Sequence, residues 1–184
     1  RKHRHCVPHT LIGRYKSNQT HHKEKVAMII TNTLTPGDLG QIVLQHGVLY
    51  SQEYGYDFTF EAYVAEPLAL FAKRKNSRER IWLVKIENKV VGSICICELS
   101  EAVAQLRWFF LDPIARGKGL GKKLLDDALS FCTEKGYSKV ILWTVAGLAA
   151  SKSLYLRYDF QLIEESEREL WGKVQLEQCY EKDL

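Results

Sequence analysis

The sequence lacks the features of a membrane-bound or exported protein. It has no run approaching the roughly 18 consecutive apolar residues that a membrane-spanning helix needs, and the basic residues that open it are not followed by the apolar stretch of a secretory signal. Metal-site spacing is also missing, because the early cluster His3, His5, Cys6 and His9 does not have the paired separation of a structural zinc site. We therefore expect a cytoplasmic protein that neither binds a membrane nor holds a metal.

Cysteine is scarce. The five cysteines are odd in number and widely spread, which favours reduced thiols over a disulfide framework. Cys95 and Cys97 lie in an apolar run, and alternation along a strand would send both thiols to the same face. Because free cysteine packs as a small hydrophobic residue, we expect these two side chains to be buried and inert.

Positive charge dominates only at the start of the chain. The 184 residues carry a formal net charge of +4, which taken alone suggests an acidic or nucleic-acid partner. Residues 1–25, however, hold seven of the 26 basic residues and one of the 22 acidic residues, so the rest carries a net charge of −2. We interpret residues 1–26 as a basic, His-rich flexible extension and residues 27–184 as one folded domain. Nucleic acid is then an expected partner only under the minor alternative that the extension itself binds it.

Hydrophobic periodicity predicts a chain that mixes strands and helices. Apolar or alternating runs bounded by turn residues predict strands over residues 28–34, 81–86, 90–98, 104–111, 140–145, 161–167 and 174–181. Helical spacing with end signals predicts helices over residues 35–49, 60–73, 120–135 and 149–158. This order, β-α-α-β-β-β-α-β-α-β-β, favours an α+β fold whose sheet combines antiparallel and parallel pairs.

The most informative stretch is the glycine-rich segment 116–123, between a predicted strand and a predicted helix. Gly117, Gly119 and Gly121 let the backbone point successive N–H groups at an anion, at the positive end of the helix dipole. The segment matches neither the nucleoside-triphosphate loop nor the dinucleotide fingerprint. It indicates a cradle for a pyrophosphate, with a solvated glycine-rich turn as the alternative.

The surroundings of this segment resemble one protein family. The pattern Arg116-x-x-Gly119-x-Gly121, after a strand that ends in Leu-Asp-Pro, is similar to the acyl-CoA loop of the GNAT superfamily of acyl-CoA N-acyltransferases. Further matching elements follow in the family's order, namely strand 106–111, helix 120–135, strand 139–144 and a segment, 149–160, similar to the signature Leu-Tyr-x-x-x-Gly-Phe. The resemblance implies the α+β GNAT fold, with a central, mixed, mostly antiparallel sheet flanked by helices and splayed between strands 4 and 5.

A finer resemblance lies upstream. Residues 46–57 and the following Phe60-Glu61-Ala62 look like the acetyltransferase half of bacterial chains whose other half is a winged-helix repressor. No such DNA-binding segment is present in these 184 residues, so a transcriptional role does not carry over.

The resemblance implies that acetyl-CoA binds as cosubstrate along the strand before the loop and on the loop itself. Backbone atoms of the strand would pair with the pantetheine arm, and loop amides would hold the pyrophosphate. The implied cofactor-binding residues are Phe109, Phe110, Leu111, Arg116, Gly117, Lys118, Gly119, Leu120, Gly121, Lys122 and Ser151.

The resemblance also places the general acid at Tyr155. A phenol with a pKa of about 10 is protonated at neutral pH and can donate a proton to a departing thiolate. Tyr158 is the alternative three residues on, and Asp159 stands where the family has glycine, a position that favours left-handed backbone. We predict Glu61 as the general base; the other carboxylates in the region, and water, stay open as alternatives, and they are Glu53, Glu98 and Glu101.

Together these features predict an N-acetyltransferase that moves the acetyl group of acetyl-CoA to a primary amine of a small molecule or peptide, by direct attack in a ternary complex. The aromatic residues between Tyr50 and Tyr63 would wall the acceptor pocket. The alternative is a non-catalytic module that senses acyl-CoA or another effector for a fused or associated transcription factor. No metal is needed for the reaction, and a homodimer is left open.

Overall fold

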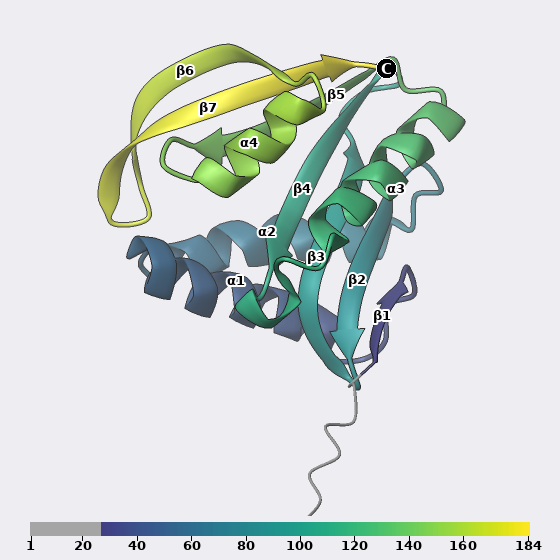
Figure 1. Ribbon diagram of the computed structural model, residues 1–184, viewed down its shortest axis with the longest axis horizontal. Helices are drawn as coiled ribbons and strands as arrows, with labels where there is room; N and C mark the ends of the chain where they lie inside the picture. The colour runs from purple at the N-terminus through teal and green to yellow at the C-terminus, as the bar shows by residue number, and fades with distance from the viewer. Residues whose placement is uncertain (1–26) are drawn as a thin grey trace, which may run out of the picture.

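The computed structural model describes residues 27–184 as a seven-stranded sheet with helices on both faces (Figure 1). The predicted extension and the early His/Cys cluster lie outside these residues. The strands are β1 (Met28–Thr31), β2 (Arg80–Ile86), β3 (Lys89–Glu98), β4 (Val103–Leu111), β5 (Lys139–Val145), β6 (Gln161–Leu170) and β7 (Lys173–Asp183). The helices are α1 (Asp38–Tyr54), α2 (Thr59–Arg74), the short 3₁₀ helix η1 (Pro113–Ala115), α3 (Leu120–Glu134) and α4 (Ala149–Arg157).

The sheet order is β1-β2-β3-β4-β5-β7-β6, and every neighbouring pair is antiparallel except β4–β5. The parallel pair is short, running from Val103 opposite Lys139 to Leu106 opposite Leu142. Beyond it the two strands separate, and Figure 1 shows β5, β6 and β7 turning away from β1–β4. This confirms the predicted GNAT fold, including the splay between strands 4 and 5.

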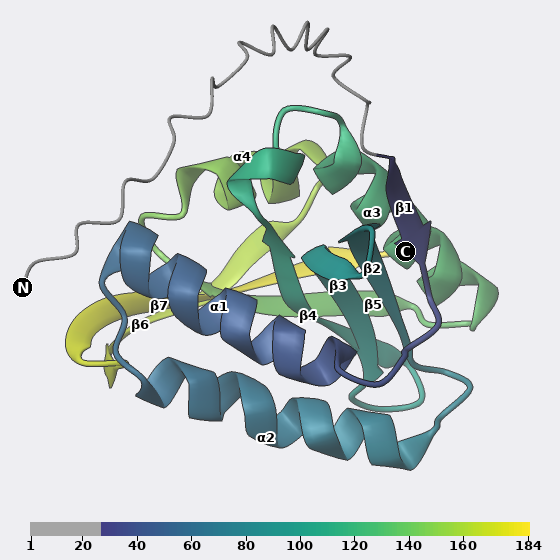
Figure 2. The same ribbon diagram turned by 90° about the horizontal axis from the view of Figure 1, so that it is seen from below.

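Two hydrophobic cores hold the layers together. On one face, apolar side chains of α3 and α4, such as Leu124, Leu125 and Tyr155, pack on the sheet. On the other, α1 and α2 contribute residues such as Ile42 and Val64 (Figure 2). Cys95 and Cys97 both belong to the second core, with their sulfur atoms 3.8 Å apart and their thiols free. The prediction that they are buried on one face is confirmed.

The start of α1 differs from the prediction. The sequence pattern places the N-cap at Thr35, but the helix begins at Asp38 after Gly37, whose φ is +96°. The reason is the Asp38 carboxylate, which accepts hydrogen bonds from the Thr35 N–H at 2.7 Å and from the Lys85 ammonium of β2 at 2.7 Å. This carboxylate holds the preceding turn outside the helix and ties α1 to the sheet.

The β6–β7 hairpin is longer than the sequence pattern predicts. Trp171 and Gly172 form its tip, both with positive φ (+52° and +84°), the backbone that a tight two-residue hairpin turn requires. The tip lies against the loop between α1 and α2, where the Asp57 N–H donates to the Trp171 carbonyl at 3.1 Å. Of the helices within residues 27–184, none is long and apolar enough to cross a membrane.

Candidate active site

The gap between β4 and β5 holds two adjoining cavities. One, of about 180 Å³, lies beside the end of β4 nearest the glycine-rich loop, and we call it the loop-side cavity. The second, of about 100 Å³, is lined by residues of β4, β5, α1, α2, α4 and the β6–β7 hairpin, and we call it the aromatic cavity. Tyr50, Phe109 and Ser151 line both, so a molecule in one cavity can reach a molecule in the other.

The loop-side cavity suits a long, flexible ligand arm. Past Leu106, the edge of β4 that faces β5 has no partner strand, so its polar backbone groups are available to a ligand that lies alongside. The walls are otherwise mainly apolar. The cavity is lined by Leu49, Tyr50, Glu53, Tyr54, Phe109, Phe110, Leu111, Arg116, Gly121, Ala150, Ser151 and Leu154.

The glycine-rich loop at the end of this cavity has the backbone that binds an anion. Gly117 and Gly119 have φ values of +71° and +75°, and the first hydrogen bond of α3 runs from the Lys123 N–H to the Gly119 carbonyl. Within the described residues, the N–H groups of Leu120 and Gly121 therefore have no carbonyl partner. Free N–H groups at a helix start attract an anion.

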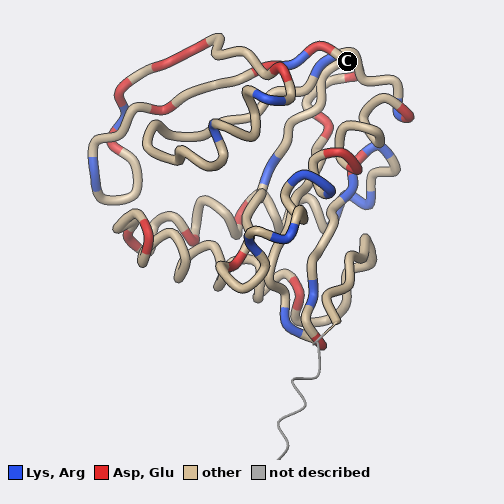
Figure 3. The backbone as a smooth tube through the Cα atoms, viewed as in Figure 1, with Lys and Arg blue, Asp and Glu red and all other residues tan. Residues whose placement is uncertain are grey.

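The loop's basic side chains are engaged with the protein itself. Lys118 donates to the Ile114 carbonyl at 2.6 Å, and Lys122 pairs with Asp126 at 2.9 Å. Arg116 donates to the Leu111 carbonyl and pairs with Glu53 of α1, in each case at 2.9 Å or less. Figure 3 shows the basic residues gathered around the loop and the start of α3. Their charge favours an anion there, while the contacts to it come from the backbone.

Tyr155 of α4 lines the aromatic cavity and is 5% exposed. Among the described residues its hydroxyl has no hydrogen-bond partner, as is also the case for Tyr50, Tyr56 and Tyr63 of the same cavity. The hydroxyls of Tyr137, Tyr158 and Tyr180, outside the cavity, do have partners. Burial raises the pKa of Tyr155, so the phenol keeps its proton at neutral pH. A protonated hydroxyl without a partner is ready to donate to a ligand.

The turn after α4 keeps Tyr155 in place despite its departure from the family signature. Asp159, where the family has glycine, takes a φ of +60°. The Tyr158 N–H and the Phe160 N–H both donate to the Tyr155 carbonyl, at 3.0 and 3.1 Å. Aspartate therefore adopts the left-handed backbone that the position requires.

The other predicted residues are only partly brought together. Ser151 lines both cavities, whereas Glu61 is not among the lining residues of either. Its side chain lies against Gly47 of α1, where a Cβ atom would meet the Glu61 Cγ at 2.4 Å. Glu98 accepts hydrogen bonds from Asn76 and Arg78, away from the cavities. The structure thus leaves the predicted base outside the aromatic cavity.

Several residues of the aromatic cavity were not predicted, and three of them stand out. Arg107 enters from β4, Glu177 from β7, and Trp171 from the hairpin tip. The Trp171 ring centroid lies 4.6 Å from that of Phe60 and 4.9 Å from that of Tyr56. The only signal in the sequence is that Trp171 precedes a glycine between two strand patterns, which marks a tight turn.

His46, which also lines the aromatic cavity, gives folding a pH dependence. Burial lowers the pKa of His46 to about 4, although the 2.8 Å hydrogen bond from Nδ1 to the Ile42 carbonyl works in the opposite direction. Between about pH 6.5 and 4, the unfolded chain then binds a proton that the folded chain does not. Stability is complete above about pH 6.5 and decreases as the pH falls.

We expect the free energy of unfolding to fall by about 3 kcal/mol over this range because of His46 alone. Urea unfolding at several pH values would measure it. His46→Phe, which keeps an aromatic ring in the core, should flatten this part of the profile. An equally steep decrease in the variant would contradict the assignment.

Comparison with known proteins identifies the family. The acetyltransferase (GNAT) family profile matches residues 48–160, so the chain belongs to this family. It is 31% identical over 119 residues to the uncharacterized N-acetyltransferase YjgM of Escherichia coli, covering 62% of this chain and 71% of YjgM. The chain is a GNAT N-acetyltransferase.

Solved structures agree on the fold. An acetyltransferase from Streptococcus agalactiae superposes with a TM-score of 0.66 at 23% identity, covering 85% of this chain and 98% of that one. The Salmonella typhimurium protein yncA, solved with its cofactor acetyl-CoA, superposes with a TM-score of 0.65 at 16% identity, covering 85% and 94%. Acetyl-CoA is the acetyl donor of the family.

Proposed function

We propose that this chain transfers the acetyl group of acetyl-CoA directly to a primary amine of a small molecule, with both substrates bound at once. The observation that carries the proposal is the free, protonated Tyr155 hydroxyl in the aromatic cavity, which shares lining residues with the loop-side cavity. One cavity suits the donor and the other the acceptor. We further propose that residues 27–184 form the catalytic domain and residues 1–26 an extension to it.

The donor fits the loop-side cavity. The unpaired edge of β4 at Phe109, Phe110 and Leu111 would bind the amide groups of the pantetheine arm. The amides from Gly117 to Lys122, including those of Lys118, Gly119 and Leu120, would hold the pyrophosphate. Arg116 and Ser151 line the same cavity and complete the donor site.

A side chain that fills the space at Gly121 should weaken the binding of acetyl-CoA. A Cβ atom there would lie 3.5 Å from Leu111 Cδ1 and 3.8 Å from Leu154 Cδ2, in ordinary contact, so a valine can be accommodated without a backbone clash. Its methyl groups would occupy the loop-side cavity. We expect Gly121→Val to raise the Kd for acetyl-CoA about 10-fold or more, since overpacking costs about 1–3 kcal/mol.

Isothermal titration calorimetry with acetyl-CoA measures this change. Gly40→Val is the matched control, because a Cβ atom at Gly40 of α1 meets nothing within 4 Å. An unchanged Kd for Gly121→Val would place the donor elsewhere.

The chemistry requires two proton movements. The amine nitrogen attacks the thioester carbonyl, the new C–N bond forms and the C–S bond breaks. Tyr155 donates its proton to the departing sulfur, and burial of the site leaves the thiolate poorly solvated without that proton. The proton lost by the ammonium group needs an acceptor at the other end of the cavity.

We propose Glu177 as that acceptor in place of Glu61. Of the described residues that line the aromatic cavity, Glu177 alone is a carboxylate, and its side chain is 19% exposed. Glu61 would have to leave its contact with Gly47 to reach an amine there. A carboxylate must come within hydrogen-bond reach, directly or through one water, of the proton that it removes.

Two finer expectations bear on this proposal. The resemblance to the acetyltransferase half of winged-helix fusion chains stays a prediction, and so does the alternative of a sensing module without turnover. A sensor needs the two cavities but has no use for a free hydroxyl at Tyr155.

A thiol-release assay with acetyl-CoA and a panel of amines tests the proposed function. We expect amine-dependent release of CoA together with the N-acetylated product by mass spectrometry. Binding of acetyl-CoA without release in the presence of any amine would contradict catalysis and support the sensor.

A further inference from the structure

The aromatic cavity has one positive and one negative side chain in walls that are otherwise mostly apolar or uncharged. Arg107 contributes the guanidinium group and Glu177 the carboxylate. The other ionisable nitrogen group in the lining, His46, is neutral at physiological pH. A molecule that fills this cavity therefore meets one charge of each sign.

Arg107 lies directly before a bulge in β4. The residues of β4 from Arg107 to Phe110 lie opposite Cys95 to Ser93 of β3, so β4 has one extra residue, and Trp108 has a φ of +47°. Strand alternation places Arg107 on the same side as Gln105, which also lines the cavity, and β-bulges are common beside active sites. The guanidinium carbon lies 5.2 Å from the centroid of the Trp108 ring.

Arg107 has no anionic partner within residues 27–184. None of the ion pairs there includes it, and its one side-chain hydrogen bond is a 3.4 Å contact with Gln105 Oε1. A half-buried guanidinium group without a carboxylate is costly unless a ligand supplies one. Arginine is also the side chain best shaped for a bidentate contact with a carboxylate.

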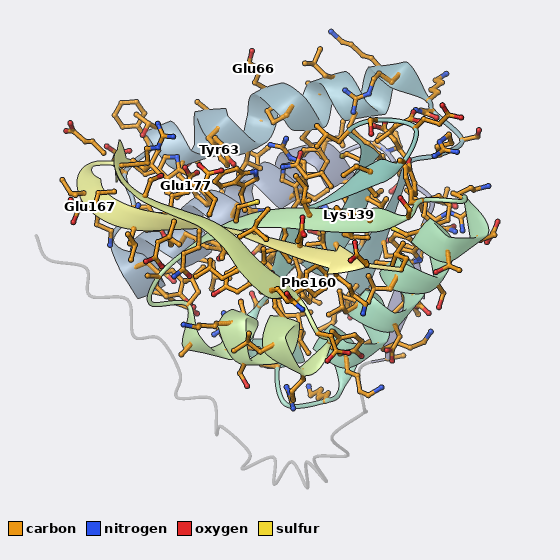
Figure 4. The ribbon with its side chains drawn as sticks, turned by 90° about the horizontal axis from the view of Figure 1, so that it is seen from above. Tyr63, Glu66, Lys139, Phe160, Glu167 and Glu177 are labelled. Carbon is orange, nitrogen blue, oxygen red and sulfur yellow. The ribbon has the colours of Figure 1, made fainter. Side chains whose placement is uncertain are left out.

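Glu177, on β7, lines the same cavity as Arg107. Its ion pair with Arg168 is long, at 3.7 Å, and Arg168 is more than half exposed. Figure 4 shows Tyr63 of α2 close to Glu177. Tyr63 experiences both charges, since Arg107 lowers and Glu177 raises its pKa, in addition to the larger increase caused by burial. The two charges thus face one small space.

The cavity is small. A water molecule needs roughly 10–15 Å³ on this scale, so about 100 Å³ holds on the order of seven to ten non-hydrogen atoms. That is the size of a free amino acid. The hairpin tip, with Trp171 packed against Phe60 and Tyr56, closes the wall beside it.

We propose that the acceptor is the amine of a free α-amino acid with an apolar side chain, whose carboxylate pairs with Arg107 and whose ammonium group faces Glu177. This inference rests on the proposed function. Arg107 is then a specificity-determining residue, and Glu177 both orients the amine and receives its proton.

The same charges disfavour the other acceptors that a primary amine could represent. A simple amine would bring a positive charge into the cavity and leave Arg107 without a partner. A peptide N-terminus has its first carboxyl group in an amide bond, so it also lacks the anion. Only the free amino acid supplies both a carboxylate for Arg107 and an ammonium group for Glu177.

Matched acceptors test the proposal. L-Leucine, L-methionine and L-valine are each compared with their amides and with the corresponding decarboxylated amines, by CoA release. We expect kcat/KM for each acid to exceed that of its amide and amine by about 10–100-fold, the worth of a charge-assisted hydrogen-bonded contact. Arg107→Gln should reduce this ratio towards one, and Arg107→Lys should restore part of it. Arg157→Gln, an exposed arginine of α4 outside both cavities, is the control.

Three outcomes separate the possibilities. An acid preference that is lost in Arg107→Gln and partly restored in Arg107→Lys supports the proposal. Turnover of amines with no acid preference, or an equal loss for all acceptors in Arg107→Gln, overturns it and leaves the proposed function standing.

If no acceptor is turned over, the proposed function fails. Binding measurements then test the amino-acid site separately. Calorimetry of L-leucine, L-methionine and L-valine with the CoA-bound protein then supports the amino-acid site if Arg107→Gln weakens binding. Absence of binding of all three overturns it.

Discussion

Tyr155→Phe is expected to lower kcat by about 10²–10⁴-fold, the usual contribution of a general acid. The phenyl ring preserves the contacts of Tyr155 with Phe160, 5.8 Å between ring centroids, and removes only the hydroxyl that protonates the departing sulfur. KM for acetyl-CoA should change little, because backbone groups bind the donor. Steady-state CoA release at saturating acetyl-CoA measures the effect.

Tyr158→Phe, at the C-terminal end of the same helix, is the matched control. Its hydroxyl donates to Asp126 and lines neither cavity, so its loss should leave kcat within a few-fold of the wild type. Equal losses in the two variants, or full activity of Tyr155→Phe, would remove Tyr155 from the chemistry.

Lys85→Met is expected to lower the free energy of unfolding by about 3–5 kcal/mol, which is the cost of breaking a buried ion pair from one side. The Lys85 and Asp38 side chains are 9% and 2% exposed and 2.7 Å apart. Burial alone would raise the pKa of Asp38, but hydrogen bonds from Lys85 and Thr35 lower it, so the carboxylate is charged in the folded protein. Without Lys85 that charge has no ionic partner among residues 27–184.

Thermal and urea unfolding measure this loss. At about 2–4 °C per kcal/mol for a chain of this size, Tm should fall by roughly 6–20 °C. Adding Asp38→Asn should recover part of the loss, because no charge is then left buried.

Lys139→Met is the control for Lys85→Met. The Lys139 and Glu181 side chains are 32% and 28% exposed, and surface pairs contribute about 0–1 kcal/mol. A similar loss of unfolding free energy in both lysine variants would show that the loss does not depend on burial of the Lys85–Asp38 pair.

The fold could be predicted because its signals are local. The strand predicted at 104–111 is β4, Val103–Leu111, and the helix predicted at 120–135 is α3, Leu120–Glu134. Glycine and proline mark these ends: Asp112-Pro113 stops the strand, and Gly136, with φ +75°, follows the helix. Each boundary depends on a few adjacent residues, which a sequence displays directly.

The acceptor side of the site could not be predicted because it depends on long-range pairing. Arg107 and Glu177 line the same cavity only because β7 pairs with β5, where Glu177 lies opposite Val145. Trp171 reaches α2 only because the hairpin is long. Conversely, Glu61 is close in sequence to residues that line the cavity. Its side chain nevertheless packs against Gly47 of α1 and stays outside the cavity.

The net charge of the chain likewise indicates a ligand only when the position of each charge is considered. The cations on which the two binding proposals rest lie around the glycine-rich loop and at Arg107. We propose a pyrophosphate as the ligand of the first group and a carboxylate as the ligand of the second. The formal net charge of +4 alone indicates neither ligand.

A crystal structure with CoA and an amino-acid acceptor tests the central claim most directly, that the two cavities hold the two substrates on either side of Tyr155. We predict the pantetheine arm along β4 at Phe109–Leu111, its sulfur within hydrogen-bond distance of the Tyr155 hydroxyl, and the acceptor between Arg107 and Glu177. A sulfur atom out of reach of Tyr155, or an acceptor bound outside the aromatic cavity, would contradict it.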